Sequence, residues 1–239
     1  MKILGFSGGK DSTAAALGLA ERGEDFKLLF TPTGDELPLL WAHIERVAQL
    51  IDRELVVLKA EHDLYSYIDV YNTLPSVRSR WCTRILKIVP CIAYLKRHPG
   101  STLLVGLRAD EEERVGLYGP YATYRYPLRE WGWGVQEVLG YIRSKGLKVP
   151  ARTDCALCPY QSAREWWQLW RDYPERYARG EALEARTGHT FRSPTGKHGR
   201  WAASLAGMRT QFEAGMLPRG AGQPGLLDGE EEICRVCRL

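Results

Sequence analysis

The chain has 239 residues, a formal net charge of +4 and a hydrophobic content of 44%, which are ordinary values for one α/β domain with a small appendage. No apolar run approaches the roughly 20 residues of a membrane-spanning helix. Glycine and charge also interrupt the N-terminus too early for a signal peptide, so we expect a cytoplasmic protein with no membrane partner. The slight excess of Lys and Arg permits contact with nucleic acid but does not require it.

Short apolar runs alternate with helical patterns along the first part of the chain. The strands are predicted at residues 2–6, 26–31, 54–60 and 101–108, and the helices at 11–23, 36–51, 84–98 and 134–147. Strands that alternate with helices form βαβ units, whose strands are parallel. The sequence therefore predicts an α/β fold with a doubly wound, mostly parallel sheet over residues 1–150.

The pattern changes after about residue 116, and residues 151–239 are predicted to form a small helical extension that contains cysteines. An aromatic amphipathic helix is expected at residues 162–177, followed by a polar, basic loop at 193–200. The helix could serve as an interface. A core position is the more common role for such a helix, because Trp166 and Trp170 share one face.

The stretch FSGGKDST follows the first predicted strand and opens the first predicted helix. It does not match the common phosphate-loop pattern G-x-x-x-x-G-K-[ST], and a bare strand-to-helix turn is the simpler alternative. The complete stretch favours an anion site. Glycines let the backbone approach an anion closely, and the start of a helix presents free N–H groups. The residues concerned are Ser7, Gly8, Gly9, Lys10, Asp11 and Ser12.

Four of the six cysteines form two C-x-x-C pairs, Cys155/Cys158 and Cys234/Cys237. In a reducing compartment this spacing indicates metal, cluster or redox chemistry rather than disulfides. The tail pair could be a redox pair, a sulfur carrier or metal ligands. Cys91 lies on the apolar face of a predicted helix and is interpreted as a packed core residue.

Several segments, in the same order, resemble one known family. They are SGGKDS, FTPTGDELP, RWCTRILKI, GLRADEEERV, YPLREWGWGVQEVLGYIRSKGL and CALCPYQSAREW, and they extend over most of the first 175 residues. The chain resembles the PP-loop ATP pyrophosphatases (adenine nucleotide α-hydrolase-like, HUP-like fold), in the phosphoadenosine phosphosulfate (PAPS) reductase branch. It departs from that branch at Pro32, where Asp is usual, and at Glu112, which replaces Ser.

The resemblance implies ATP and Mg²⁺ as cofactors, with cleavage of ATP between its α- and β-phosphates. The stretch Ser7–Ser12 would then clamp the pyrophosphate, with Lys10 and Asp11 in catalytic roles. The other residues that the resemblance assigns to cofactor binding are Thr33, Gly34, Glu36, Arg80, Arg84 and Arg108. Arginine suits bidentate contacts with phosphate or sulfate.

The resemblance also implies a [4Fe-4S] cluster held by Cys82, Cys155 and Cys158, because related reductases place a cysteine pair where this chain has Trp81-Cys82. Three protein ligands would leave one iron open to a sulfide or a substrate atom. A Zn²⁺ ion is the alternative, since thiolates suit both centres. The fourth ligand would then come from Cys234 or Cys237.

Three functions follow. The first is an enzyme that adenylates an acceptor, nucleic acid or nucleotide, releases pyrophosphate and transfers sulfur. Cys234 and Cys237 would be catalytic, and a cysteine desulfurase or thioredoxin-like protein would supply sulfur. The second is a sulfonucleotide reductase that releases sulfite. The third is a non-catalytic subunit that senses nucleotide or binds a partner. The intact SGGKDS favours the first, and the tail EEICRVCRL lacks the E-C-G-[LI]-H context of the reductases.

Overall fold

The strands form one parallel sheet with the order β3-β2-β1-β4-β5. The structure is a computed structural model that describes the chain except residues 112, 114–117, 151–152, 194–198 and 222–239. The strands are β1 (Lys2–Gly5), β2 (Lys27–Phe30), β3 (Leu55–Val57), β4 (Thr102–Leu104) and β5 (Thr123–Arg125). The predicted α/β fold with a parallel sheet is confirmed, and β5 adds a strand that the sequence pattern does not predict.

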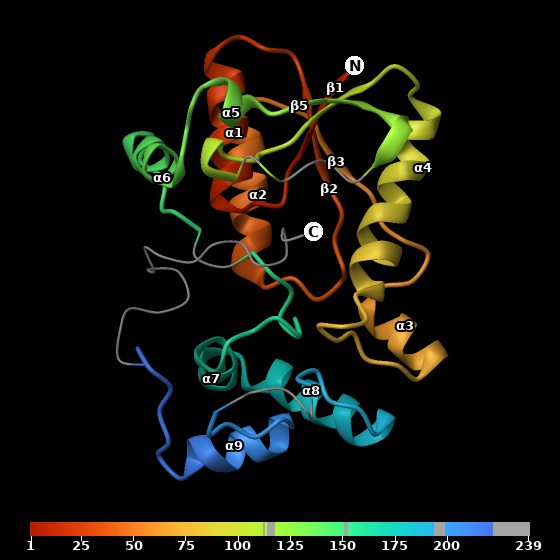
Figure 1. Cartoon of the computed structure of the whole chain (residues 1–239), viewed down its shortest axis with the longest axis vertical. Helices are drawn as coiled ribbons and strands as arrows, with labels where there is room; N and C mark the ends of the chain where they lie inside the picture. The colour runs from red at the N-terminus through yellow and green to blue at the C-terminus, as the bar shows by residue number, and fades with distance from the viewer. Residues whose placement is uncertain (112, 114–117, 151–152, 194–198, 222–239) are drawn as a thin grey trace.

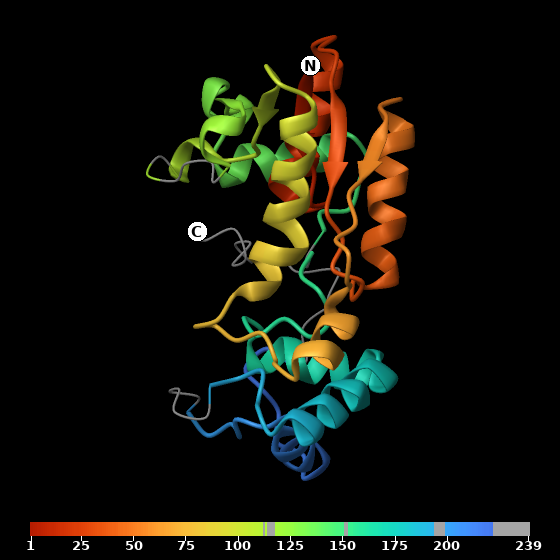
Figure 2. The same cartoon turned by 90° about the vertical axis from the view of Figure 1, so that its right-hand side faces the viewer.

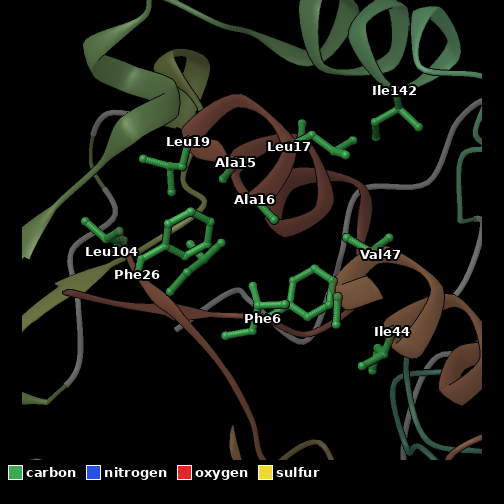
Figure 3. Close-up of a cluster of buried hydrophobic side chains, with 14 of the residues drawn as sticks. Phe6, Ala15, Ala16, Leu17, Leu19, Phe26, Ile44, Val47, Leu104 and Ile142 are labelled. Carbon is green, nitrogen blue, oxygen red and sulfur yellow. The ribbon is translucent and has the colours of Figure 1, made fainter. Parts of the chain in front are cut away.

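Helices cover both faces of this sheet (Figures 1 and 2). The helices of this layer are α1 (Lys10–Glu21), α2 (Pro38–Leu50), α4 (Val89–Arg97), α5 (Pro127–Glu130) and α6 (Val135–Ser144). Because side chains alternate along a strand, Leu4 and Leu104 pack with α1, α2 and α6, whereas Ile3 and Leu103 pack with α4. Figure 3 shows the first of these clusters, which surrounds α1: Leu17 of α1 lies toward Ile142 of α6, and Phe6 lies on the other side of α1, toward α2.

The strand order places a switch point beside β1. The chain runs outward from β1 to β2 and β3, and then returns to pair β4 with the other edge of β1. In open α/β sheets, ligands bind at the carboxyl ends of the strands where the order reverses. The segments that leave β1 and β4, residues 6–9 and 105–108, therefore meet where a ligand site is expected.

A second layer of helices follows the sheet domain: α7 (Ala163–Asp172), α8 (Pro174–Thr187) and α9 (Leu205–Glu213). The prediction of one helix over residues 162–177 is wrong, since α7 ends before Tyr173 and α8 begins at Pro174. Proline lacks an N–H group and disfavours a helical conformation in the residue before it. Tyr173 accordingly has φ −139° and ψ 60°.

The core of these helices also includes α3 (Leu64–Tyr71), which precedes them by many residues in the chain. Leu64 and Ile68 pack in the same cluster as Trp166, which is fully buried. The core interpretation of the Trp-rich helix is therefore confirmed. The boundary between residues 150 and 151 stays a prediction. Among the described residues, no helix is both long and apolar enough to cross a membrane.

Glu184 joins α8 to the two segments that follow it. Its carboxylate accepts hydrogen bonds from the backbone N–H groups of Phe191, at 3.0 Å, and Leu205, at 2.7 Å. Burial raises the pKa of Glu184 from 4.5 to about 7, and these two hydrogen bonds only partly oppose the shift. The folded chain thus binds this proton more tightly than the unfolded chain does.

We expect Glu184 to lower the free energy of unfolding as the pH rises from about 5 to about 7, because in that window the unfolded chain has released this proton while the folded chain still holds it. Glu184→Gln cannot titrate. The difference in unfolding free energy between wild type and this variant should change by up to about 1.4 kcal/mol per pH unit there. Urea unfolding at several pH values measures it, and parallel curves for the two proteins would contradict the assignment.

Candidate functional site

The loop after β1 forms an open cradle at the start of α1. Gly9 is the N-cap residue and makes no side-chain capping bond, so the first N–H groups of α1 are not covered by a cap. Gly8 has φ +73°, a conformation that favours glycine. A Cβ atom at Gly8 would also lie 2.6 Å from Leu40 Cδ1 of α2. The loop conformation therefore depends on glycine, and the cradle is a candidate anion site.

Hydroxyl groups shape the rest of the cradle. Ser7 Oγ lies 3.3 Å from Ser12 Oγ and accepts a hydrogen bond from the Gly9 N–H at 3.3 Å. Ser12 Oγ donates to the Gly9 carbonyl at 3.1 Å. The predicted residues Ser7–Ser12 are thus brought together as a turn of backbone and hydroxyl groups.

Charged groups gather around Asp11. Its Oδ2 atom lies 3.3 Å from Lys10 Nζ and 2.9 Å from a guanidinium nitrogen of Arg108, which follows β4. Arg108 is 4% exposed and also pairs with Asp110 at 2.8 Å. Asp11 Oδ1 is buried and has no hydrogen-bond partner in the described part of the chain. Two cations and a carboxylate with one unused oxygen therefore border the cradle.

The loop after β2 folds around Glu36. The carboxylate of Glu36 accepts hydrogen bonds from the Thr33 N–H at 2.6 Å, from Thr33 Oγ1 at 2.7 Å and from the Gly34 N–H at 3.0 Å. Both carboxylate oxygens are used inside the loop. Glu36 therefore stabilises the loop conformation. The ligand-binding role predicted for Thr33, Gly34 and Glu36 stays a prediction.

Asp35 is the residue of this loop that the sequence patterns did not single out. It is fully buried, and its Oδ2 accepts a hydrogen bond from the Leu157 N–H at 2.7 Å. Its Oδ1 accepts one from the Tyr65 hydroxyl and lies 3.3 Å from Arg176. Its backbone carbonyl accepts the Ala156 N–H at 2.8 Å. Asp35 thereby fixes the turn between Cys155 and Cys158 onto the sheet domain.

The buried position raises the pKa of Asp35 above its ordinary value, although the hydrogen bonds from Tyr65 and Leu157 oppose the shift. The only available sequence signal was an acidic residue beside a glycine after a strand. Its partners lie far away in the chain, and the pattern gave no indication of them.

A second cavity collects the predicted metal ligands. The residues that line it are Thr33, Arg80, Cys82, Thr83, Lys87, Asp154, Cys155, Cys158, Pro159 and Tyr160. We call it the thiol pocket. It encloses about 380 Å³, counted with the part that is open to solvent. Three segments build it: the loop after β2, the turn at 154–160, and the π-helix η1 (Thr83–Ile88), which runs directly into α4.

The thiol pocket combines three thiols with a cation. Cys82 lies at the start of η1, and π-helical turns occur frequently at functional sites. Burial and the neighbouring Cys155 raise the pKa of the Cys82 thiol. Burial lowers the pKa of Lys87, but the nearby acidic groups, Cys155 first among them, outweigh this effect and raise it overall. Lys87 is therefore a fixed positive charge beside the thiols.

Cys82, Cys155 and Cys158 converge on this pocket, and Cys155 and Cys158 are hydrogen-bonded to each other. Yet in the described ranges no three His, Cys, Asp or Glu side chains are already placed as a set that could hold a metal ion. The donor set fits a thiolate-bound centre in kind and location. A bound centre would require the three side chains to draw closer together.

The cradle and the thiol pocket are neighbours. A Cβ atom at Gly9 would lie 3.3 Å from Thr153 Oγ1, and Thr153 comes two residues before Cys155. Thr33, at the carboxyl end of β2, lines the thiol pocket. The segment that runs from Thr153, beside Gly9, to Asp154 and Cys155 therefore leads from the cradle to the thiol pocket.

The remaining predicted residues lie in different parts of the structure. Arg80 lines the thiol pocket, whereas Arg84 is exposed on η1 and Arg108 belongs to the cradle. Cys91 is 1% exposed in the cluster between α4 and the sheet, which confirms the core interpretation, and burial raises its pKa to about 11. Cys234 and Cys237 lie outside the described residues.

Comparison with known proteins agrees with this geometry. Residues 2–151 match the family model described as the phosphoadenosine phosphosulfate reductase domain. A PAPS reductase from Candida auris, solved as a phosphate complex, has a similar fold, with a TM-score of 0.51 and 15% identity over 61% of this chain and 73% of that chain.

Two curated proteins are similar in sequence. An uncharacterized protein of Methanocaldococcus jannaschii is 26% identical over 188 residues, which cover 72% of this chain and 44% of that protein. The nin region protein ORF290 of Escherichia phage lambda is 26% identical over 201 residues, covering 69% of this chain and 68% of that protein. The match thus spans less than half the length of the archaeal relative.

Replacement of Asp35 should loosen the turn between Cys155 and Cys158, which we call the cysteine turn. We expect Asp35→Asn to lower the free energy of unfolding by about 2 kcal/mol, since a buried charged acceptor loses hydrogen bonds. Cys158, which is 4% exposed, should react faster with iodoacetamide under native conditions. Tyr65→Phe removes one donor and is the control, with an expected loss of about 1 kcal/mol. If Asp35→Asn changed neither the free energy of unfolding nor the rate at which Cys158 reacts with iodoacetamide, Asp35 would not fix this turn.

Proposed function

The chain belongs to the phosphoadenosine phosphosulfate reductase domain family, and from that premise we propose that it is an enzyme that cleaves ATP to AMP and pyrophosphate. In this proposal ATP activates an acceptor, a nucleic acid or nucleotide, and sulfur then replaces the activated oxygen. The observation that carries the proposal is that Thr153 lies beside Gly9 of the cradle, while the next two residues, Asp154 and Cys155, line the thiol pocket.

The cradle suits the β- and γ-phosphates. The uncapped start of α1 offers N–H groups, and Lys10 and Arg108 supply positive charge at the same place. The buried, unpartnered Asp11 Oδ1 fits a hard cation such as Mg²⁺. When bound, Mg²⁺ would neutralise charge on the departing pyrophosphate.

The first step is a displacement at the α-phosphorus of ATP. An acceptor oxygen attacks the α-phosphorus of ATP, the bond from that phosphorus to the bridging oxygen breaks, and pyrophosphate leaves. The acceptor oxygen then carries AMP. Lys10, Arg108 and the N–H groups of α1 stabilise the charge that develops on the leaving oxygens, which is the main contribution a protein makes to phosphoryl chemistry.

The second step uses the thiol pocket. A sulfur nucleophile at the oxidation level of sulfide, supplied by a donor protein, attacks the activated carbon, a new carbon–sulfur bond forms, and AMP leaves with the original oxygen. Lys87 lies among the thiols and would favour an anionic sulfur there. A [4Fe-4S] cluster on Cys82, Cys155 and Cys158 would supply an open iron to hold that sulfur, and Zn²⁺ is the alternative centre.

The family itself favours a second candidate, reduction of a sulfonucleotide to sulfite. That substrate already carries its adenylate, and the reaction releases no pyrophosphate. Because no pyrophosphate leaves, the reduction would require neither Lys10 beside Asp11 nor an intact cradle to stabilise a leaving group. The products formed from each substrate separate the two candidates.

For the ATP step, we expect labelled ATP with Mg²⁺ and acceptor to yield AMP and pyrophosphate. Lys10→Ala should lower the rate by about a hundredfold, because one preorganised charge at the leaving group is lost. Lys27→Ala is the matched control, since Lys27 pairs with Glu54 at the opposite end of the strands. ADP as the product, or sulfite released from PAPS with thioredoxin in place of pyrophosphate, would overturn the proposal.

For the metal centre, we expect anaerobically purified protein to contain iron and sulfide and to absorb broadly near ~400 nm. Cys82→Ala and Cys155→Ala should abolish this absorption. Cys91→Ala should keep it, because Cys91 lies in a different core cluster. Colourless protein that contains stoichiometric zinc would contradict the cluster and support the zinc centre. Wild-type protein without any metal would contradict both centres.

A further inference from the structure

Three aromatic rings lead from the residue next to Cys82 to the protein surface. The Trp81 ring stacks on Tyr67, with centroids 4.2 Å apart and planes 24° apart, and Tyr67 packs on Tyr71 at 4.4 Å. Trp81 precedes Cys82, which lines the pocket, and Tyr71 is 57% exposed at the end of α3. The rings thus form a ladder that begins at the chain neighbour of a pocket residue and ends in solvent.

A fourth ring, that of Tyr160, belongs to the lining of the pocket itself. The Tyr160 hydroxyl donates a hydrogen bond to the Val77 carbonyl at 3.1 Å. The guanidinium of Arg80 lies 5.1 Å from the centre of the Tyr160 ring. These contacts tie the segment between α3 and η1 to the cysteine turn.

Two arginines, each three positions from Trp81 in the chain, carry charge that the described part of the chain does not neutralise. Arg78 and Arg84 are exposed, and neither makes an ion pair with a described residue. Other arginines of the protein do pair. On α3 itself, Asp69 lies 2.5 Å from Arg186 and so does not compensate the two free charges. Asp154 lines the pocket beside Lys87.

Rings and unpaired cations together define a surface that we call the rim. Its members are Tyr67, Tyr71, Trp81, Tyr160, Arg78 and Arg84. We propose that the rim binds single-stranded nucleic acid and presents an unpaired base to the thiol pocket. This deepens the proposed function, on which it rests, by naming the acceptor class and its binding surface.

The chemistry of the rim favours this occupant. Each base has a flat face that stacks on an aromatic ring, and phosphates need cations that carboxylates have not already neutralised. A base within a duplex is stacked on both sides, so the ladder can accept only a base that is unpaired or at a strand end. The pocket at the foot of the ladder then receives the atom to be modified.

Fluorescence anisotropy tests the proposal with the full chain. The probes are a fluorescein-labelled single strand of about 12 nucleotides, in RNA and DNA versions, and the same sequence as a duplex. We expect the single strand to bind more tightly. Tyr71→Ala should weaken its binding about fivefold or more, while Tyr71→Phe should keep it, because the ring rather than the hydroxyl is used.

The arginines have a separate signature. Arg78→Ala combined with Arg84→Ala should weaken binding and make the slope of log affinity against log salt shallower by about 1.4, as two phosphate contacts are lost. Arg97→Ala is the matched control, because Arg97 is also exposed and lies at the far end of the α4 helix that continues η1. Its affinity and slope should equal those of wild type.

The outcomes separate this inference from the proposed function. If ATP yields AMP and pyrophosphate but the rim variants bind single strands as wild type does, the inference fails and the function stands. If the rim variants lose binding but ATP is not cleaved, the rim stands and the function fails. Equal binding of duplex and single strand, or competition by mononucleotides at the same concentration as by oligonucleotides, would overturn the rim as a single-strand site.

Discussion

One buried carboxylate determines how the two halves of the site lie relative to each other. Asp35 accepts hydrogen bonds from α3 and from the cysteine turn, and it pairs with α8, so a single side chain fixes three segments to the loop after β2. Leaving such a group unpaired in the interior costs several times more than one hydrogen bond gains. The thiol pocket keeps its position beside the cradle, because moving the turn that holds Cys155 and Cys158 would leave the buried Asp35 carboxylate without hydrogen-bond donors.

The fold was largely predictable from the sequence, because its signal is local. Apolar runs and helical periodicity located β1, α1, β2, α2, β3, α4, β4 and α6 but not α3, α5 or α9, and the parallel sheet followed from their alternation. Predictions failed where a single residue overrides the pattern. Pro174 divides the aromatic helix into α7 and α8, and the three residues of β5 are too few to show alternation.

The site was predictable only in part. SGGKDS and the cysteine spacing reveal their chemistry through residue type, and the structure places them at adjoining sites. The contacts that set their geometry are long-range. Leu157 and Asp35 are 122 positions apart, and Arg108 and Asp11 are 97 apart, so no window of sequence contains both partners. That Arg84 has no ion-pair partner among the described residues likewise depends on which acidic side chains the fold brings nearby.

The position of α3 has a consequence for how the chain is made. Its apolar face packs with Trp166 and Phe191, which are synthesised about a hundred residues later. While the protein emerges from the ribosome, the sheet can form first, but α3 must wait with Leu64 and Ile68 uncovered until the C-terminal helices arrive. The glycine cradle can thus exist before the thiol pocket does. The pocket also requires residues 154–160, so it can be completed only after that part of the chain has been synthesised.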